Sequence, residues 1–239
     1  MSKVKSALLV TTLAVGVALA GGSAYAADLM HAAAPGVVQA PAPEGMYVSV
    51  FAGAAFAADP TGIYDDFYAF KFPETTGYVI GGTVGTHVSP NLRAELELSY
   101  VSHQGTGFMT IDDETGTTGT GSFNTLYVLG NAWYDFDTGS AFTPYIGGGA
   151  GLAVIMPDIT NIFDDANDYE FKTAAVAPAA QVGAGFKYQI ADNIALDVGY
   201  RAKFVFNGTL QESGVFGSDK VTNLSYVDQT VSAGLTFGF

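Results

Sequence analysis

Residues 92–100 read LRAELELSY, and this stretch alternates strictly between two kinds of side chain. Leu96 and the other apolar or small residues fall on one face of an extended strand, and Arg93, Glu95 and Glu97 fall on the other, because strand side chains alternate with period two. A soluble barrel would bury the leucines and expose the charges to water. A membrane barrel would turn the leucines to lipid and enclose the charges. The face that points inward therefore decides the class of protein.

The same alternation recurs along most of the chain and predicts an all-β fold. Glycine and β-branched residues crowd the alternating segments, and no apolar stripe of helical period runs through them. We therefore expect eight strands, at residues 46–57, 77–88, 92–103, 123–136, 142–155, 174–190, 194–206 and 224–239.

The connections between these strands alternate in length. The three short ones are 89–91, 137–141 and 191–193, and the four long ones are 58–76, 104–122, 156–173 and 207–223. In an antiparallel up-and-down barrel, every second connection lies at the same end, so the long loops share one end and the short turns and both termini share the other. Bacterial outer-membrane barrels have this asymmetry, with short periplasmic turns and long external loops.

The face opposite the leucines has the composition of a narrow barrel interior. It is rich in glycine and carries nine charges, five acidic and four basic, whereas a soluble surface is about a quarter to a third charged. Glycines make room for long side chains inside an eight-stranded barrel, and enclosed charges must be paired. We therefore predict a lumen charge network made of Arg93, Glu95, Glu97, Asp135, Lys187, Asp197, Arg201 and Lys203, with Asp228 as the ninth charge.

The first 45 residues do not share the strand pattern. Lys3 and Lys5 precede an apolar run, residues 7–20, and the tripeptide AYA at 24–26 matches a small-residue cleavage site. We expect residues 1–26 to be a cleavable signal peptide, 27–45 an Ala/Pro-rich periplasmic linker and 46–239 the barrel.

Composition excludes several functions. The chain has no cysteine, which rules out zinc–thiolate sites and thiol nucleophiles. Without residues 1–26 it has 7 Lys+Arg against 23 Asp+Glu, a net charge of −16. Such acidity argues against nucleic acid as a partner, because phosphate binding requires basic patches. No cofactor and no catalytic or metal-binding motif is predicted.

Several stretches together resemble a known family. They are GMYVSVFAGAAF (45–56), NLRAELELSY (91–100), GNAWYDF (130–136), TPYIGGGAGLAV (143–154), VGAGFKYQI (182–190) and the terminal VSAGLTFGF (231–239). They look like the outer-membrane-protein β-barrel domain family, the eight-stranded group similar to the OmpA transmembrane domain, to OmpX-like barrels and to porin-family surface antigens. The resemblance implies the outer membrane of a Gram-negative bacterium, both termini periplasmic, and insertion by the β-barrel assembly machinery, with Phe237 and Phe239 in the recognition signal.

The leading functional hypothesis is a non-enzymatic barrel that supports envelope integrity or recognises a surface partner through four long acidic extracellular loops, in contact with outer-membrane lipid and lipopolysaccharide. The first alternative is a narrow porin-like channel for ions or small solutes. The second is a lipid A-modifying barrel enzyme. His87 and Ser89 have the H-x-S spacing of a lipid A deacylase, but they lie at a short turn and therefore at the periplasmic end.

The loops also suggest a cation partner. Residues 112–114 read DDE and residues 164–170 read DDANDYE. Oxygen-rich clusters of this kind suit calcium or magnesium. We therefore expect divalent cations to bridge these carboxylates to anionic lipopolysaccharide.

Overall fold

The structure, a computed structural model, describes residues 45–64, 68–71, 75–111, 115–160, 173–211 and 220–239. No helix in these ranges is long and apolar enough to cross a membrane. The regular elements described are strands: β1 (Met46–Tyr64), β2 (Tyr68–Lys71), β3 (Thr75–Ser89), β4 (Leu92–Ile111), β5 (Thr115–Asp135), β6 (Phe142–Thr160), β7 (Ala175–Ala191), β8 (Ile194–Gln211) and β9 (Lys220–Gly238).

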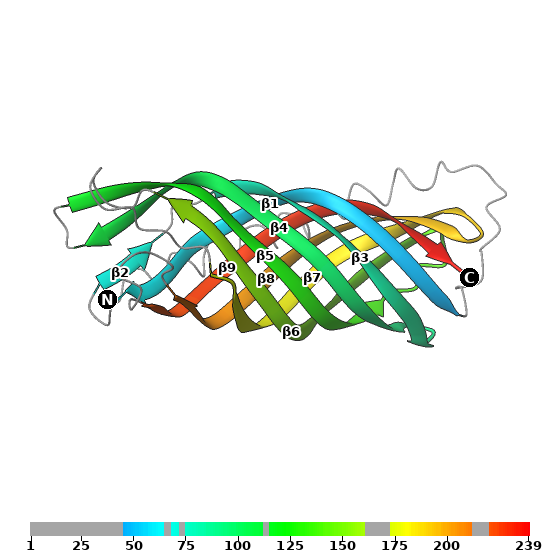
Figure 1. Ribbon diagram of the computed structural model, residues 1–239. Helices are drawn as coiled ribbons and strands as arrows, with labels where there is room; N and C mark the ends of the chain where they lie inside the picture. Colours follow the sequence, from blue (N-terminus) through cyan, green and yellow to red (C-terminus); the bar gives the residue numbers. More distant parts are fainter. Residues whose placement is uncertain (1–44, 65–67, 72–74, 112–114, 161–172, 212–219) are drawn as a thin grey trace. The chain divides into compact units, whose positions relative to one another are not determined.

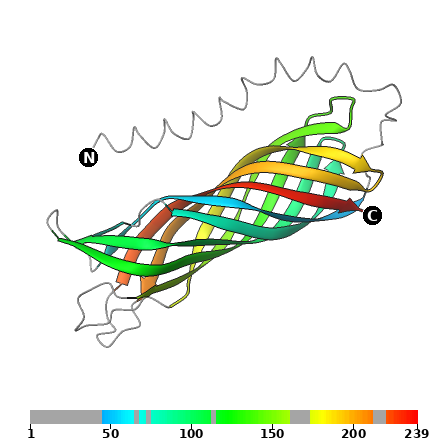
Figure 2. The same cartoon turned by 90° about the horizontal axis from the view of Figure 1, so that it is seen from above.

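The eight long strands form a closed antiparallel ring. Each pairs with the next along the chain, and β9 pairs back onto β1 from Tyr47↔Gly238 to Tyr64↔Val221. The red β9 and the blue β1 lie side by side in both views (Figures 1 and 2). The predicted fold, an eight-stranded up-and-down β-barrel, is confirmed.

The strands run further toward the long-connection end than the sequence pattern indicates. The β4–β5 ladder continues without a shift from Leu92↔Tyr134 to Ile111↔Thr115. The predicted long loop at 104–122 is therefore wrong, because most of it is a hairpin. Glycine and threonine dominate that stretch, so it lacks the regular apolar face on which the prediction relied.

The predicted loop at 58–76 also contains regular structure. The end of β1 and the short strand β2 pair there, from Thr61↔Lys71 to Tyr64↔Tyr68, and β2 also pairs with β4 at Phe70↔Met109. The middle parts of the last two predicted loops, 161–172 and 212–219, lie outside the described residues. The expected signal peptide and nearly all of the expected linker also fall outside them and stay predictions.

The leucine face of β4 points outward. Leu96 and Leu98 are 56% and 55% exposed, whereas Arg93 is 2% exposed and Glu97 is 0% exposed. An apolar belt surrounds a charged interior, which is the arrangement of a membrane barrel and the reverse of a soluble one. A membrane crossing takes about 9–11 residues of a tilted strand, so strands of 15 to 21 residues extend beyond the bilayer.

Aromatic side chains lie near both edges of the apolar belt. Tyr78 and Tyr100 are in contact at one edge, with ring centroids 6.4 Å apart, and Tyr134 and Phe136 are in contact at the other, with centroids 5.1 Å apart. Amphipathic rings of this kind favour membrane interfaces.

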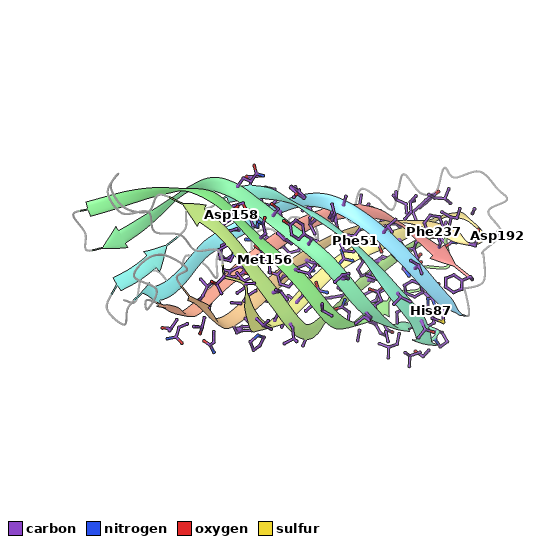
Figure 3. The ribbon with its side chains drawn as sticks, in the orientation of Figure 1. Phe51, His87, Met156, Asp158, Asp192 and Phe237 are labelled. Carbon is purple, nitrogen blue, oxygen red and sulfur yellow. The ribbon has the colours of Figure 1, made fainter. Side chains whose placement is uncertain are left out.

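The short turns and the carboxyl terminus share one end of the barrel. The amide of Phe239 donates to the carbonyl of Met46 at 3.0 Å, and the amide of Gly238 donates to Asn193 at 2.9 Å. His87, Asp192 and Phe237 lie toward this end, and Met156 and Asp158 lie toward the other (Figure 3). We call the end with the short turns the turn end, and the end with Met156 and Asp158 the loop end.

Candidate functional site

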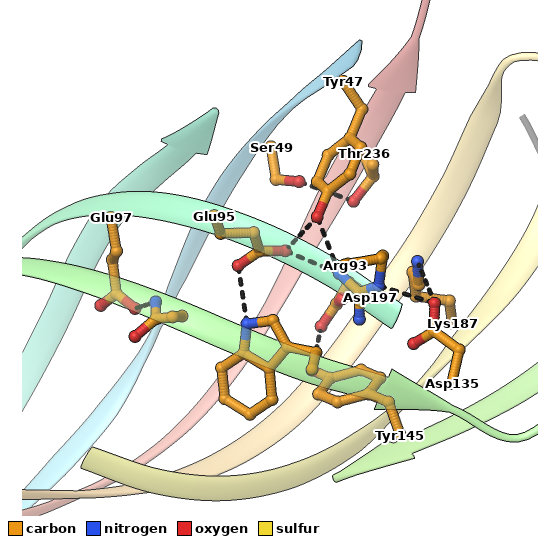
Figure 4. A network of polar contacts seen from close by, with 12 residues as sticks. Tyr47, Ser49, Arg93, Glu95, Glu97, Asp135, Tyr145, Lys187, Asp197 and Thr236 are labelled. Atoms are coloured by element: carbon orange, nitrogen blue, oxygen red, sulfur yellow. Dashed lines mark hydrogen bonds and ion pairs between the residues drawn. The ribbon is translucent and has the colours of Figure 1, made fainter. Parts of the chain in front are cut away.

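The predicted charges meet inside the barrel, and Arg93 organises the layer nearest the turn end (Figure 4). Its Nη1 lies 2.6 Å from Oε1 of Glu95, and its Nε lies 2.7 Å from Oδ2 of Asp135. The hydroxyl of Tyr47 donates to Oε1 of Glu95 at 2.7 Å, and the indole N–H of Trp133 donates to Oε2 at 2.9 Å. Glu95 is therefore bound from three sides, which stabilises its charge in a narrow interior.

Two further predicted residues join this layer by weaker contacts. Nζ of Lys187 lies 3.5 Å from Oδ2 of Asp135. Asp197 accepts a hydrogen bond from the hydroxyl of Tyr145 at 2.7 Å. Among the side chains that the structure describes, Asp197 has no basic partner within 4.0 Å, so a tyrosine satisfies this carboxylate.

Arg201 is held by rings and a hydroxyl. Its guanidinium carbon lies 5.2 Å from the ring centroid of Phe51 and 5.4 Å from that of Trp133. Its Nη1 donates to Oγ of Ser232 at 3.0 Å. No carboxylate of the described part of the chain lies within 4.0 Å of it, so cation–π contacts replace the ion pair expected from the sequence.

Glu97 and Lys203 form the next layer, and both are 0% exposed. Nζ of Lys203 pairs with Oε1 of Glu97. Ser99 donates to Oε1 of Glu97 at 2.7 Å, and the side-chain amides of Gln181 and Asn131 donate to Oε2 at 2.7 and 3.0 Å. The carboxylate of Glu97 thus has one cationic partner and three further hydrogen-bond donors. A buried charge requires partners of this kind.

A third polar cluster lies closer to the loop end. Nε2 of His103 lies 3.0 Å from Oδ1 of Asp228, and the hydroxyl of Tyr127 donates to Oδ2 at 2.6 Å. Thr125 and Tyr226 share a hydrogen bond of 2.7 Å beside them. The sequence places Asp228 in the lumen but gives no signal that His103 is its partner.

Apolar side chains surround the third polar cluster in the loop half of the lumen. The sequence pattern predicts an interior of glycines and polar groups, and this buried cluster of aliphatic and aromatic side chains departs from that prediction. Its members are Ala55, Val79, Val101, Phe123, Tyr127, Leu129, Ala153, Ile155, Ala175, Ala177, Ala179, Val205, Leu224 and Tyr226. Most of these residues lie on the same face of their strands as the lumen charges. The apolar residues on that face toward the loop end are therefore the sequence signal for the cluster.

The remaining predicted residues do not join the lumen network. Phe237 and Phe239 are 38% and 73% exposed at the turn end, and their role as an assembly signal stays a prediction. The ring of His87 packs at a tilt against the ring of Tyr47, with centroids 5.5 Å apart. Among the described residues, no serine or threonine hydroxyl bonds to His87 or His103. The acidic residues 112–114 and 164–170 lie outside the described residues.

A family comparison agrees with this architecture. The model of the outer membrane protein beta-barrel domain matches residues 13–239. The chain belongs to the outer-membrane-protein β-barrel domain family. It is therefore an outer-membrane protein of the Gram-negative type, and the family suggested by its sequence motifs is confirmed.

Individual relatives support the same fold. The outer membrane protein PagN of Salmonella typhimurium is 37% identical over 78 residues, which are 32% of this chain and 32% of PagN, so the match spans about a third of either protein. Neisserial surface protein A matches 82% of this chain and 97% of its own with 19% identity and a TM-score of 0.50. OprG from Pseudomonas aeruginosa matches 82% and 98% with 14% identity and a TM-score of 0.53.

Proposed function

We propose that the protein is a closed, non-enzymatic outer-membrane barrel that supports the envelope and presents its loop end for recognition outside the cell. The observation that carries this proposal is the sealed lumen. Glu97 and Lys203 are 0% exposed in the charged layer, and Leu129 and Ile155 are 0% exposed in the apolar cluster. A solute must pass every cross-section, so one sealed layer is enough to block conduction.

The channel alternative is the weaker one for two reasons. An ion would have to displace Lys203 from a carboxylate that already has three further donors. It would also meet the buried apolar side chains around this pair, where an unpaired charge is costly. A path that suits the charged groups is unsuited to the apolar ones.

The enzyme alternative lacks an assembled constellation. Catalysis by a hydroxyl nucleophile needs a base within hydrogen-bond reach and an acid that orients the base. His103 has its acid, Asp228, but is only 2% exposed and bonds to no hydroxyl within the described ranges. His87 lies at the turn end, beside Tyr47.

We propose further that the turn end faces the periplasm and the loop end faces outward. The short connections and the tied carboxyl terminus at the turn end, and strands that extend past the membrane belt at the loop end, support this orientation. Recognition would then fall to the β4–β5 hairpin and the other projecting strands.

Conductance tests the closed lumen. The purified protein is inserted into a planar bilayer, with folding confirmed by its heat-modifiable gel shift, and we expect no stable current steps. The double variant Leu129→Ala/Ile155→Ala thins the apolar cluster and should also stay closed, because the layer of Glu97 and Lys203 remains and blocks the path by itself. The matched control is Val128→Ala/Leu152→Ala, which makes similar changes on the lipid face of the same two strands. Stable steps from the wild type would refute the proposal.

Cell-surface labelling tests the orientation. The chain has no cysteine, so single cysteines report unambiguously. We expect a membrane-impermeant maleimide to label Thr118→Cys on the β5 arm of the hairpin in intact cells, and to label Ser140→Cys at a short turn only after the outer membrane is permeabilised. The reverse pattern would mean the opposite orientation.

A further inference from the structure

The outward face of β4, β5 and β6 changes from apolar to polar toward the loop end. Leu98 on β4 pairs with Val128 on β5, and both are exposed in the apolar belt. Every second residue of a strand shares a face, so Ser102 and Asn124, which pair with each other nearer the loop end, also face outward. With their neighbours they form a polar strip, made of Ser102, Gln104, Ser122, Asn124 and Asp158.

The polar strip has hydrogen-bond acceptors that the described part of the chain does not satisfy. Nδ2 of Asn124 donates to Oγ of Ser122 at 3.0 Å, whereas its Oδ1 has no hydrogen-bond partner among the described residues. An amide oxygen without a donor is costly, and rotation of this half-buried side chain turns the oxygen outward. Asp158 is exposed and lies toward the loop end (Figure 3). The strip is therefore complementary to a ligand that donates hydrogen bonds.

An aromatic pair adjoins the polar strip at its membrane side. Tyr78 on β3 is the cross-strand partner of Ser102, and its ring centroid lies 6.4 Å from that of Tyr100. The ring of Tyr78 is exposed. The face of an aromatic ring carries partial negative charge, so it attracts the polarised C–H groups of a sugar ring. Aromatic rings beside amide and carboxylate acceptors suit a saccharide.

The charge of this surface distinguishes a sugar from a phosphate. The sequences of β3, β4, β5 and β6 contain a single lysine or arginine, Arg93. Its side chain is bound inside the lumen by Glu95 and Asp135. Phosphate groups are recognised mainly by lysine and arginine, and the strip offers a carboxylate, Asp158, in their place. A neutral hydroxyl finds acceptors here, whereas a phosphate is repelled.

We propose that the polar strip binds the neutral sugar headgroup of a glycolipid in the leaflet around the loop end. Sugar hydroxyls donate to Asp158 and Asn124, and a sugar ring packs on Tyr78. The occupant is a lipid because the strip joins the apolar belt along the same strands, so acyl chains add contacts with Leu98 and Val128 that a free sugar lacks. The inference deepens the proposed recognition role and rests on the proposed orientation for the leaflet that supplies the glycolipid.

Lipid retention tests the polar strip. The protein is placed in phosphatidylcholine nanodiscs with digalactosyldiacylglycerol or, separately, phosphatidylglycerol of the same acyl chains, and native mass spectrometry counts the lipids that stay bound. We expect the wild type to retain the galactolipid in preference to phosphatidylglycerol. Asn124→Ala/Asp158→Ala should lower the galactolipid affinity roughly tenfold or more, the loss expected for two hydrogen bonds. Equal retention of both lipids by the wild type would overturn the proposal.

The matched control removes the same two side-chain types at the other end of the barrel. Asp192→Ala/Asn193→Ala deletes an exposed aspartate and an exposed asparagine at a short turn, and it should keep the wild-type affinity. An equal loss in the two double variants would contradict the strip. Digalactose without acyl chains should bind much more weakly than the galactolipid, and equal binding would show that the occupant is a soluble glycan.

A further variant keeps the proposal testable if Asn124→Ala/Asp158→Ala does not fold, as judged by the heat-modifiable gel shift. Tyr78→Leu keeps an apolar side chain but removes the ring, so it should lower the galactolipid affinity severalfold and leave phosphatidylglycerol unchanged. An unchanged galactolipid affinity in Tyr78→Leu would also contradict the proposal. Nanodiscs carry the galactolipid in both leaflets, so the result does not depend on orientation, and the strip and the proposed orientation fail independently.

Discussion

At the scale of single residues, the buried ion pair of Glu97 and Lys203 gives a direct test of stability. Both side chains are fully buried, and removing one leaves the other as an unpaired charge. We expect Lys203→Met to lower the free energy of unfolding by about 3–5 kcal/mol. The double variant Glu97→Gln/Lys203→Met should lose clearly less than the sum of the two single changes. The measurement is urea unfolding in lipid vesicles, followed by the fluorescence of Trp133, the chain's one tryptophan. Leu98→Met on the lipid face of the same strand is the control, and additive losses would argue against the pairing.

The sequence predicts which charges enter the lumen but not how they pair. Strict alternation around Arg93 assigns each side chain to a face, because strand periodicity is local. Partners depend on the register between strands and on the length of each side chain, which a single chain does not display. Arg201 therefore lies between Phe51 and Trp133, and Asp197 bonds to a tyrosine, where the sequence suggested ion pairs with other strands.

At the scale of strands, glycine placement decides which side chains can cross the lumen. A Cβ at Gly85 of β3 would overlap the ring of Tyr47, whose hydroxyl bonds to Glu95. We expect Gly85→Ala to cost about 1–3 kcal/mol through overpacking. Gly130 of β5 faces outward, and its nearest neighbour to an added Cβ is a carbonyl oxygen 3.9 Å away. Gly130→Ala should therefore be neutral or stabilise by about 0.4–1 kcal/mol. Equal losses in urea unfolding would show that glycine content alone, and not lumen space, sets stability.

The outer face of a strand gives a second test at this scale. Leu96 is 56% exposed near the middle of the apolar belt on β4, and Val88 is 61% exposed at the turn end of β3. Leu96→Arg should cost about 2–4 kcal/mol, and Val88→Arg about 0–1 kcal/mol, because the penalty for charge depends on depth in the bilayer. Unfolding from vesicles gives both values. A similar loss of unfolding free energy at the two positions would mean that the centre of the apolar belt does not lie near Leu96.

Strand existence followed from the sequence, whereas strand length did not. Apolar alternation marks the part of each strand that crosses lipid, since only that part needs an apolar face. β4 and β5 continue to pair as far as Ile111↔Thr115, through a stretch of sequence rich in glycine and threonine. The apolar alternation that predicts a membrane strand therefore stops where the strand leaves the membrane. Backbone pairing between the two strands continues further.

At the scale of the whole molecule, the charges are divided between inside and outside. The chain has a net charge of −14, and four of its nine lysines and arginines, Arg93, Lys187, Arg201 and Lys203, are in the lumen. The lumen's five acidic and four basic groups nearly cancel, so most of the chain's acidic excess belongs to residues other than these, of which exposed Asp158 on β6 is a described member. We propose that acidic groups of this kind face the outer leaflet, where they would repel anionic lipid phosphates and where Mg²⁺ or Ca²⁺ could bridge the two through oxygen ligands.

This division predicts that chelation weakens the barrel in anionic bilayers. In vesicles that contain lipopolysaccharide and Mg²⁺, we expect EDTA to lower the heat-modification midpoint, because phosphates and protein carboxylates then face each other without a bridging cation. In vesicles of neutral phosphatidylcholine, EDTA should change little, because there are no unneutralised lipid phosphates to bridge. Sodium chloride at matched ionic strength controls for general screening. An equal drop in both kinds of vesicle would place the cation on the protein alone, and no drop in either would show that the acidic exterior meets the outer leaflet without divalent ions.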